Sequence, residues 1–501
     1  MDIVFSTFNA RYSHTALALR CLRANLGGLH DRSVILEFDN RLSPNAAAEK
    51  LLAHDPKIVL FSIYIWNLVV IYETALILKQ IRPEIKIVIG GPEVSFEYEN
   101  SLIMQLADHL VCGEGESVIE EVCQTLLGEP CRQDAGDPAP QTSCLPKVIH
   151  ASPADLGTVA LPYDEYTDED VAHRRLYVES QRGCPFKCEY CLSSLENGVR
   201  FVPPERIFPR FGKLIERGGR IFKFIDRSFN INAAHAAAVL RYFLENRRDG
   251  MMLHLEWEPE HLPPTLEKIL SEAPPGFLQL EVGVQTFNAE VSKRIDRPLN
   301  ADRVEANIRT LAALPSVHLH ADLIAGLPGE TFDSIAASFD RLHACGPNEI
   351  QLGILKKLRG APIARHDEEW GMVYNSSPPY DVLQTSTLSF PELQKIRRFA
   401  RFWDITVNNG RFPHTAPQLW RNQPSVFAAF MEWSDWLYKK THATAGFTPG
   451  RLARLLEKFL TAKRGLDKKM VSQTVETDLN GHVTGIKGME RQTLSRKNSQ
   501  S

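Results

Sequence analysis

The chain has 501 residues, of which 44% are hydrophobic and 24% are charged, and its formal net charge at pH 7 is −4. This length allows roughly two to four domains with a sizeable core, and the charge gives no reason to expect a nucleic-acid or membrane-surface partner. The nine cysteines are odd in number and unevenly spaced, which excludes a secreted disulfide framework.

The chain starts MDIVFSTFNARYSH, which lacks the charged start and the long apolar stretch of a signal peptide. No run of about 18 apolar residues follows, so we expect no membrane span. A reducing cytoplasm is the expected location.

Apolar segments alternate with helical patterns over residues 1–127. The expected strands are 3–6, 34–38, 58–62, 85–89 and 109–112, and the expected helices are 15–26, 45–54, 68–81, 98–107 and 117–127. Apolar strands separated by helices indicate a parallel sheet covered on both faces. We therefore predict an α/β fold that begins with a doubly wound, flavodoxin-like domain over residues 1–130, whose ligands bind beyond the carboxyl ends of the strands.

Residues 131–170 are rich in Pro, Gly, Asp and Ser and are interpreted as a linker. The alternation then resumes in the segment 171–375. Its expected strands are 176–179, 221–225, 253–257, 278–284, 318–324 and 349–354, and its helices are 204–217, 233–246, 264–272, 302–314 and 331–344. This pattern predicts a partial (β/α)6 barrel with its chemistry at the carboxyl ends of the strands.

Residues 376–461 read as an amphipathic helical domain, and its four tryptophans, at 403, 420, 433 and 436, are expected in its core. Residues 462–501 contain few large apolar side chains, so we predict a disordered tail there.

Cys184, Cys188 and Cys191 form a C-x3-C-x2-C triplet in the loop after the first barrel strand. Iron–sulfur clusters are held by Cys thiolates, usually four per cluster. With no fourth cysteine nearby, one iron would stay open to a chelating ligand. A zinc site usually takes four ligands, often as paired elements. A zinc site and three unrelated buried thiols are the alternatives.

The triplet, with Tyr190 before its third cysteine, resembles the signature of the radical S-adenosylmethionine (SAM) superfamily. The resemblance implies a 4Fe-4S cluster bound by the three cysteines, whose open iron is chelated by SAM. Reduction would then cleave SAM to a 5′-deoxyadenosyl radical. It also implies an electron donor such as flavodoxin or ferredoxin.

Candidate SAM residues follow the next barrel strands. By resemblance, Asp226 occupies the place that binds the SAM amino group, and a helix N-cap in that loop is the alternative. Glu256 lies in an acidic strand end that would bind ribose hydroxyls, act in acid–base chemistry or be an exposed loop.

The fourth and fifth barrel strands supply four more candidates. Glu281 and Gln285 share one face of a mostly apolar strand, which favours a wet site. Gly326 and Gly329 permit close approach of a backbone to a ligand, and their segment resembles the motif that contacts the adenine of SAM.

Four loops should meet at the carboxyl edge of the N-terminal sheet. Their candidate ligand contacts are Asn9, Ser13, Ser62, Tyr64, Trp66, Gly90, Gly91, Glu93, Gly113 and Glu114. Glycines there would admit a large flat cofactor, and the aromatic pair would cover its apolar face. The set resembles the cobalamin-binding domain joined to many radical SAM enzymes. The motif that supplies a lower axial His is absent, and a doubly wound domain with a different ligand is the alternative.

The domain order over residues 1–460 resembles cobalamin-binding radical SAM proteins with a helical C-terminal extension. That resemblance implies an enzyme that methylates or rearranges an unactivated carbon of a small-molecule substrate. One alternative is a methylthiotransferase, which would need a second cysteine-ligated cluster. Another is a non-catalytic binding module that responds to cobalamin or to redox state.

Overall fold

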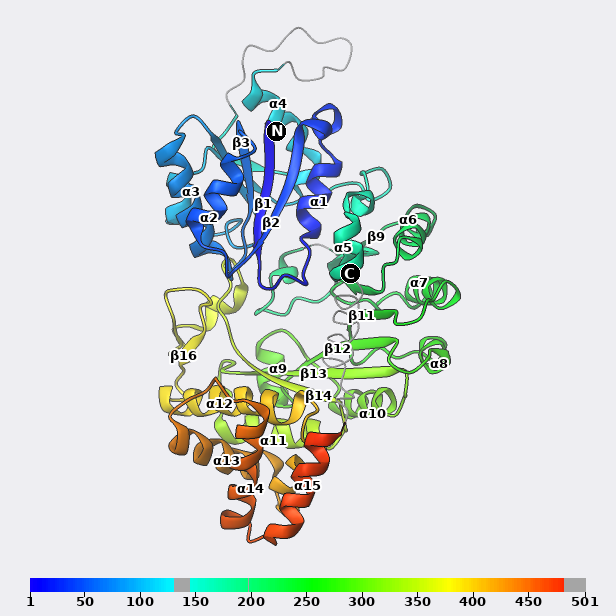
Figure 1. The fold of residues 1–501 in the computed structure, drawn as a ribbon, viewed down its shortest axis with the longest axis vertical. Helices are drawn as coiled ribbons and strands as arrows, with labels where there is room; N and C mark the ends of the chain where they lie inside the picture. Colours follow the sequence, from blue (N-terminus) through cyan, green and yellow to red (C-terminus); the bar gives the residue numbers. More distant parts are fainter. Residues whose placement is uncertain (130–144, 197, 482–501) are drawn as a thin grey trace.

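The computed structural model describes residues 1–129, 145–196 and 198–481. Figure 1 shows three parts along the long axis: an N-terminal α/β domain, a central barrel-like domain and a group of C-terminal helices. Within the described residues, no helix combines the length and the apolar character needed to cross a membrane.

The N-terminal domain is built on a six-stranded parallel sheet in the order β2-β1-β3-β4-β5-β6. Helices α2 and α3 pack on one face of this sheet, and α1 and α4 pack on the other. The double cover confirms the predicted doubly wound fold and explains why every residue of β1 and β3 is buried. The bounds are β1 Ile3–Asn9, α1 Leu17–Ala24, β2 Ser33–Asp39, α2 Pro44–Leu52, β3 Ile58–Ser62, α3 Leu68–Ile81, β4 Lys86–Gly90, β5 His109–Cys112, α4 Ile119–Leu127 and β6 Val148–His150.

Two expectations for this region are corrected. The helix expected over residues 98–107 is only a short 3-10 turn, Leu102–Gln105. The part of the expected linker that the structure describes contains β6, which pairs with β5 and extends the sheet. Residues 130–144 lie outside the described residues.

The central domain is a second parallel sheet, in the order β14-β13-β12-β11-β10-β7. Strands β7 and β14 are its two edges, so the sheet is an open, partial barrel, as predicted. Its strands are β7 Leu176–Val178, β10 Ile221–Phe224, β11 Met252–Trp257, β12 Leu278–Gln285, β13 Val317–Ala325 and β14 Glu349–Ile354. Its helices are α6 Pro204–Glu216, α7 Ala233–Glu245, α8 Pro264–Glu272, α9 Ala289–Arg294, α10 Ala301–Ala312 and α11 Phe332–His343.

The inner face of this barrel is polar. Along β13, buried residues alternate with half-buried ones, and the half-buried set includes His318, His320 and Asp322. Successive side chains of a strand point to opposite faces, so the buried residues pack under the helices and the half-buried ones line the interior. The interior of the barrel is therefore lined by polar side chains that are partly accessible to solvent.

The C-terminal helices are α12 Phe390–Trp403, α13 Val426–Thr441, α14 Pro449–Lys463 and α15 Lys468–Asn480. Of the four tryptophans expected in the core, Trp403 and Trp433 are buried, whereas Trp420 and Trp436 are half-buried and pack against that core. The predicted disordered tail is wrong for residues 468–480, because Val471 and Val475, one turn apart in α15, are buried in the main core. Asp478 also accepts backbone hydrogen bonds, from Thr415 N among others. Residues 482–501 lie outside the described residues.

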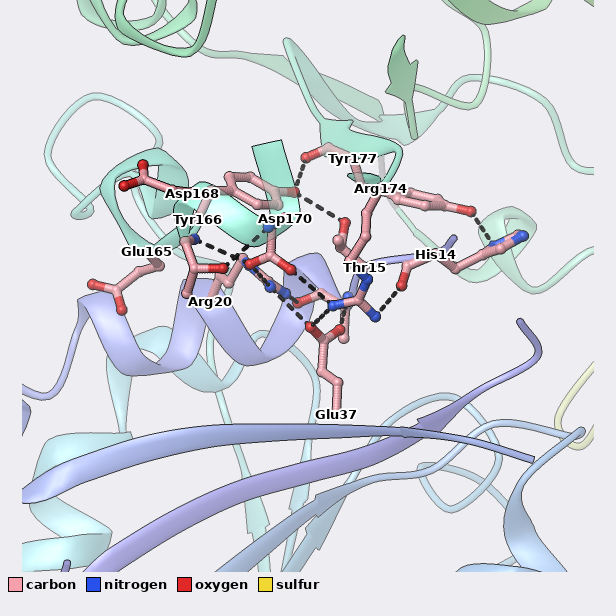
Figure 2. Close-up of polar contacts among 12 residues, drawn as sticks. His14, Thr15, Arg20, Glu37, Glu165, Tyr166, Asp168, Asp170, Arg174 and Tyr177 are labelled. Atoms are coloured by element: carbon pink, nitrogen blue, oxygen red, sulfur yellow. Dashed lines mark hydrogen bonds and ion pairs between the residues drawn. The ribbon is translucent and has the colours of Figure 1, made fainter. Parts of the chain in front are cut away.

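A buried cluster of four charges joins the N-terminal domain to the segment that leads into β7 (Figure 2). Arg20 Nη2 lies 2.8 Å from both Glu37 Oε2 and Asp170 Oδ2. Arg174 Nη1 lies 2.7 Å from Glu37 Oε2 and 2.8 Å from Asp170 Oδ1. Each cation meets both anions, so the attraction offsets the high cost of removing four charges from water.

His14, in the loop after β1, continues this contact to the barrel (Figure 2). Its Nδ1 lies 2.7 Å from Tyr177 Oη on β7. Burial, together with the nearby cations Arg175 and Lys223, lowers the pKa of His14 to about 4. The folded protein therefore keeps this imidazole neutral.

The packing of α15 is tested by Val471→Ala. Removing two buried methyl groups and leaving a cavity should destabilise the protein by about 2 kcal/mol. The midpoint of thermal unfolding should fall relative to the parent chain, whereas the exposed control Lys469→Ala should leave it unchanged. Equal midpoints for both variants would contradict the packing of this helix.

The His14 contact predicts a pH dependence. The pKa of His14 in the fold is about 4, below its ordinary value of 6.5, so its contribution to stability is complete above pH 6.5 and declines as the pH falls toward 4. Thermal unfolding should therefore show a larger loss of stability between pH 7 and pH 5 for the parent chain than for His14→Asn. Parallel curves for the two proteins would refute the assignment.

Candidate active site at the domain junction

The three cysteines lie on a hairpin formed by β8 Gln181–Cys184 and β9 Gly198–Phe201. Gly183 has φ +93°, and a Cβ atom added there would lie 2.1 Å from Gly198 O, so only glycine fits this turn of the chain. Cys184 and Cys188 are buried, and Cys191 is half-buried. One short loop therefore presents all three thiols.

A buried guanidinium faces this cysteine loop. Arg297 Nη1 donates to Cys188 Sγ at 3.4 Å, and Arg297 Nη2 donates to Gly283 O at 2.6 Å. Burial alone would lower the pKa of Arg297, but Tyr190, Glu258 and Cys188 outweigh it and raise that pKa. A permanent cation beside Cys188 complements the negative charge that a thiolate-bound metal cluster would carry.

The donor set fits an iron–sulfur cube better than a single ion. Among the described residues, no group of three or more His, Cys, Asp or Glu side chains converges on one metal position. A cube binds each thiolate at a different iron, so its ligands need not converge. Three thiols from one loop beside Arg297 match that chemistry, and a single zinc ion would need a tighter set.

Asp226 takes a different position from the one expected of a ligand contact. It is fully buried, and its carboxylate accepts hydrogen bonds from Ser180 N at 2.8 Å and from Ser180 Oγ at 2.5 Å. Burial raises the pKa of Asp226 to about 7. In this geometry Asp226 supports the chain entering β8, and its expected contact with SAM stays a prediction.

Glu256 and Glu281 lie side by side in neighbouring strands and are half-buried on the inner face of the barrel. Glu281 Oε1 lies 2.8 Å from His254 Nε2, and Lys223 Nζ lies 3.5 Å from the other oxygen. Burial raises the pKa of Glu281, but His254 and Lys223 outweigh it and leave that pKa lowered. Glu256 has one loose partner, Arg227 Nη1 at 3.5 Å.

Gln285 ends β12 in an unusual conformation. Its φ is +71°, in the left-handed region that non-glycine residues rarely adopt. Its buried Oε1 has no hydrogen-bond partner among the described residues. A strained residue with an unsatisfied acceptor, in the same strand as Glu281, is typical of a ligand site.

Gly326 and Gly329 make close approaches, but to the protein itself. A Cβ atom on Gly326 would lie 2.4 Å from Val382 Cγ1, and one on Gly329 would lie 2.8 Å from the Trp370 ring. Both glycines have positive φ. Their side-chain positions are occupied by the segment after β14, so any adenine contact would use backbone atoms only.

Two aromatic rings extend from the carboxyl edge of the N-terminal sheet. Tyr64 and Trp66 stack with ring centroids 4.5 Å apart and planes 5° from parallel. Trp66 is 48% exposed, and its indole donates to Phe8 O at 3.1 Å. Ser62, at the end of β3, is buried beneath this loop and accepts from Thr7 Oγ1 through its carbonyl. The stacked pair is an apolar platform that fits a flat cofactor.

The other N-terminal candidates have structural partners. Asn9 Nδ2 donates to Glu37 Oε1 and His14 O, both at 3.0 Å, and Ser13 O accepts from Arg175 N at 2.8 Å. The glycines support tight loops: a Cβ atom on Gly91 would lie 2.5 Å from Ile63 O, one on Gly113 2.8 Å from Ala151 O, and one on Gly90 3.1 Å from Val111 O.

Glu93 and Glu114 bind other parts of the chain. Tyr380 Oη donates to Glu93 Oε1 at 2.5 Å, and Arg359 Nε lies 3.2 Å from the same oxygen. Glu114 Oε2 lies 2.7 Å from Arg182 Nη1 on β8, and its other oxygen pairs with Arg200 on β9. Both carboxylates connect a loop of the N-terminal domain to another part of the chain, and their expected cofactor contacts stay predictions.

Sequence reasoning missed the cationic residues of this site. Arg182 lies 2.7 Å from Glu116 and from Glu179 as well as from Glu114. Arg297 lies in a loop that carries no recognisable pattern. The inner histidines had a signal, because β13 reads VHLHADLIA and places polar residues at every second position.

Three family models match the chain in succession. The B12 binding domain matches residues 4–123, the Radical SAM superfamily matches residues 178–342, and a protein of unknown function (DUF4080) matches residues 368–485. The first two coincide with the doubly wound domain and with the barrel that carries the cysteines.

Two curated relatives are similar to the chain at low sequence identity. The uncharacterized methyltransferase PH0819 of Pyrococcus horikoshii is 25% identical over 341 residues, which cover 64% of this chain and 72% of the relative. The cobalamin-dependent radical SAM methyltransferase TokK of Streptomyces tokunonensis is 25% identical over 338 residues, which cover 60% of this chain and 47% of TokK. The chain thus spans less than half the length of TokK.

The cobalamin-dependent SAM radical enzyme OxsB, solved with aqua-cobalamin bound, has the same fold. Its TM-score is 0.61 at 13% sequence identity, and the match covers 99% of this chain and 84% of OxsB. The likeness extends over the order of the domains as well as their individual folds. The chain therefore joins an N-terminal B12-binding domain to a radical SAM domain, the arrangement of a cobalamin-dependent radical SAM enzyme.

Proposed function

We propose that this enzyme methylates an unactivated carbon of a small-molecule substrate, with its 4Fe-4S cluster at Cys184, Cys188 and Cys191. When bound, the cluster supplies the electron that cleaves SAM to a carbon radical, and cobalamin supplies a transferable methyl group. A one-electron donor of the flavodoxin or ferredoxin class would reduce the cluster. Rearrangement without methyl transfer is the second reaction that these cofactors support.

The observation that carries the proposal is the link between the cysteine loop and the N-terminal sheet. Arg182, on the strand that ends at Cys184, pairs with Glu114 and Glu116 of the loop after β5. The proposed cluster site and the carboxyl edge of the N-terminal sheet are therefore neighbours. Chemistry that uses two cofactors in turn needs this proximity.

The residues of the chain bind and orient the reactants. Arg297 offsets the negative charge of the thiolates, and the Tyr64–Trp66 platform covers an apolar ring face. The ionised Glu281 and the half-buried Glu256 offer acceptors for hydroxyl or amino groups inside the barrel. The polar interior supports a hydrophilic substrate.

The relatives favour methylation over rearrangement. PH0819 and TokK are both described as methyltransferases. A ribosomal protein uS12 methylthiotransferase RimO from Prochlorococcus marinus also matches, but over only 38% of this chain. The larger overlap with the methyltransferases supports the proposal.

Cluster chemistry is tested by Cys188→Ala. Loss of one of three thiolates should reduce iron and sulfide content after anaerobic reconstitution and reduce SAM cleavage under strong reductant to background. The control Cys345→Ala removes a buried thiol in the turn after α11 and should retain both properties. Full iron content and SAM cleavage in Cys188→Ala would refute the assignment.

Cobalamin binding is tested by Trp66→Ala. Removing an aromatic face that a ligand buries should raise the dissociation constant for cobalamin about tenfold or more, measured from its absorption spectrum. Phe390→Ala, which removes a comparably exposed ring from α12, should bind cobalamin as the parent does. Unchanged affinity in Trp66→Ala would place the cofactor elsewhere.

A further inference from the structure

One segment contacts three of the loops assigned above to the cofactors. It comprises residues 355–382, between the end of β14 and the start of β16 Val382–Gln384, and we name it the strap. Figure 1 shows it in yellow, between the N-terminal domain and the C-terminal helices. The strap belongs neither to the barrel sheet nor to the C-terminal helices, so its role needs a separate explanation.

The strap holds the cysteine loop through Glu189, which lies between Cys188 and Cys191. His366 Nε2 lies 2.6 Å from Glu189 Oε2, and both side chains are buried. Ile363 N donates to Glu189 O at 2.9 Å. Side-chain and backbone contacts together fix the loop at this position.

The strap also covers the glycine loop after β13. Trp370 and Val382 fill the space beside Gly329 and Gly326, where a side chain would clash. The guanidinium of Arg294 stacks 4.2 Å above the Trp370 ring and donates to Pro328 O at 2.8 Å. Strap and loop are therefore packed without room for movement.

Residues near both chain ends of the strap contact the Gly-Gly-Pro-Glu loop of the N-terminal domain. Tyr380 and Arg359 both bind the buried carboxylate of Glu93. Gly360 N donates to Glu97 Oε1 at 3.0 Å. Tyr380 has φ +56°, a strained conformation for a tyrosine that its contacts must maintain.

The strap is itself a closed unit. Lys357 N donates to Tyr380 O at 3.1 Å, and Val382 N donates to Leu355 O at 2.9 Å, so its two ends pair with each other. A displacement of Tyr380 is therefore passed to the paired residues 357–360 and along the chain to Ile363 and His366 at the cysteine loop.

We propose that the strap sets the position of the cysteine loop relative to the Gly-Gly-Pro-Glu loop, with His366, Tyr380 and Arg359 as positioning residues. The contacts stand without any cofactor, whereas their consequence for catalysis rests on the proposed function. The two loops belong to different domains, and the strap contacts both. It therefore controls the separation of the two bound cofactors.

Hydrogen exchange tests, without any cofactor, whether the strap couples the positions of the two loops. Tyr380→Phe removes one hydroxyl that binds Glu93, and it should speed amide exchange in the Gly-Gly-Pro-Glu loop and also in residues 185–191, which the middle of the strap contacts. Tyr374→Phe removes a hydroxyl from the same strap whose partner is Met372 Sδ, and should change neither loop. Faster exchange confined to the loop around Glu93 would overturn the proposal.

Electron paramagnetic resonance tests whether the strap sets the separation between the bound cluster and the bound cobalamin. The reduced cluster and Co(II) cobalamin each carry an unpaired electron, and their dipolar interaction falls steeply with separation. His366→Gln and Tyr380→Phe should each change this interaction, while Tyr374→Phe should leave it at the parent value. In the double variant the two changes should not add, because both residues act through one unit.

The outcomes separate the two proposals. A parent protein that shows neither cluster nor cobalamin signal refutes the proposed function, and the exchange experiment then decides the strap alone. A parent with both signals, together with His366→Gln and Tyr380→Phe variants that keep the parent interaction, overturns the strap and leaves the proposed function intact.

Discussion

Buried charge pairs hold the carboxyl edge of the N-terminal sheet against the barrel. Arg20, Glu37, Asp170 and Arg174 form a closed set on the side of β7, in which every member has two partners of opposite charge. Such a set is tolerable when complete, and losing one member would leave a buried charge without compensation, at a cost of about 3–5 kcal/mol. The orientation of the two domains is therefore tightly fixed, unlike the mobile arrangement expected of domains joined by a linker.

The open barrel explains why this attachment matters. Strands β7 and β14 are the two edges of the barrel sheet, and each continues into a segment that binds the N-terminal domain. Arg174, just before β7, pairs with Glu37, and Tyr380, in the segment after β14, donates to Glu93. Between them, Arg182 joins the cysteine hairpin to Glu114. The N-terminal domain thus closes the gap in the barrel and contacts the cysteine hairpin itself.

Local patterns were sufficient for the long strands of both parallel sheets, most of the helices and the cysteine triplet, because those features depend on neighbouring residues. Asp226, Glu93 and Glu114 were expected at ligands by resemblance, but an acid after a strand looks the same in sequence whether or not it also binds a distant part of the chain. Their partners come from remote parts of the chain: Tyr380 lies 287 positions from Glu93, and Arg182 lies 68 positions from Glu114. No single-sequence pattern encodes such pairings.

The strap limits how the molecule can be dissected. Residue 375, the boundary suggested by sequence patterns, falls inside it, and the DUF4080 match also begins within it, at residue 368. Beyond the strap, Phe399 and Trp403 of α12 pack edge-on against Phe339 of the barrel helix α11. A chain cut after the barrel would lose this anchor and, with it, the support of loops in both other domains. A fragment that is to keep both loops in place must therefore retain the strap and the helix that anchors it.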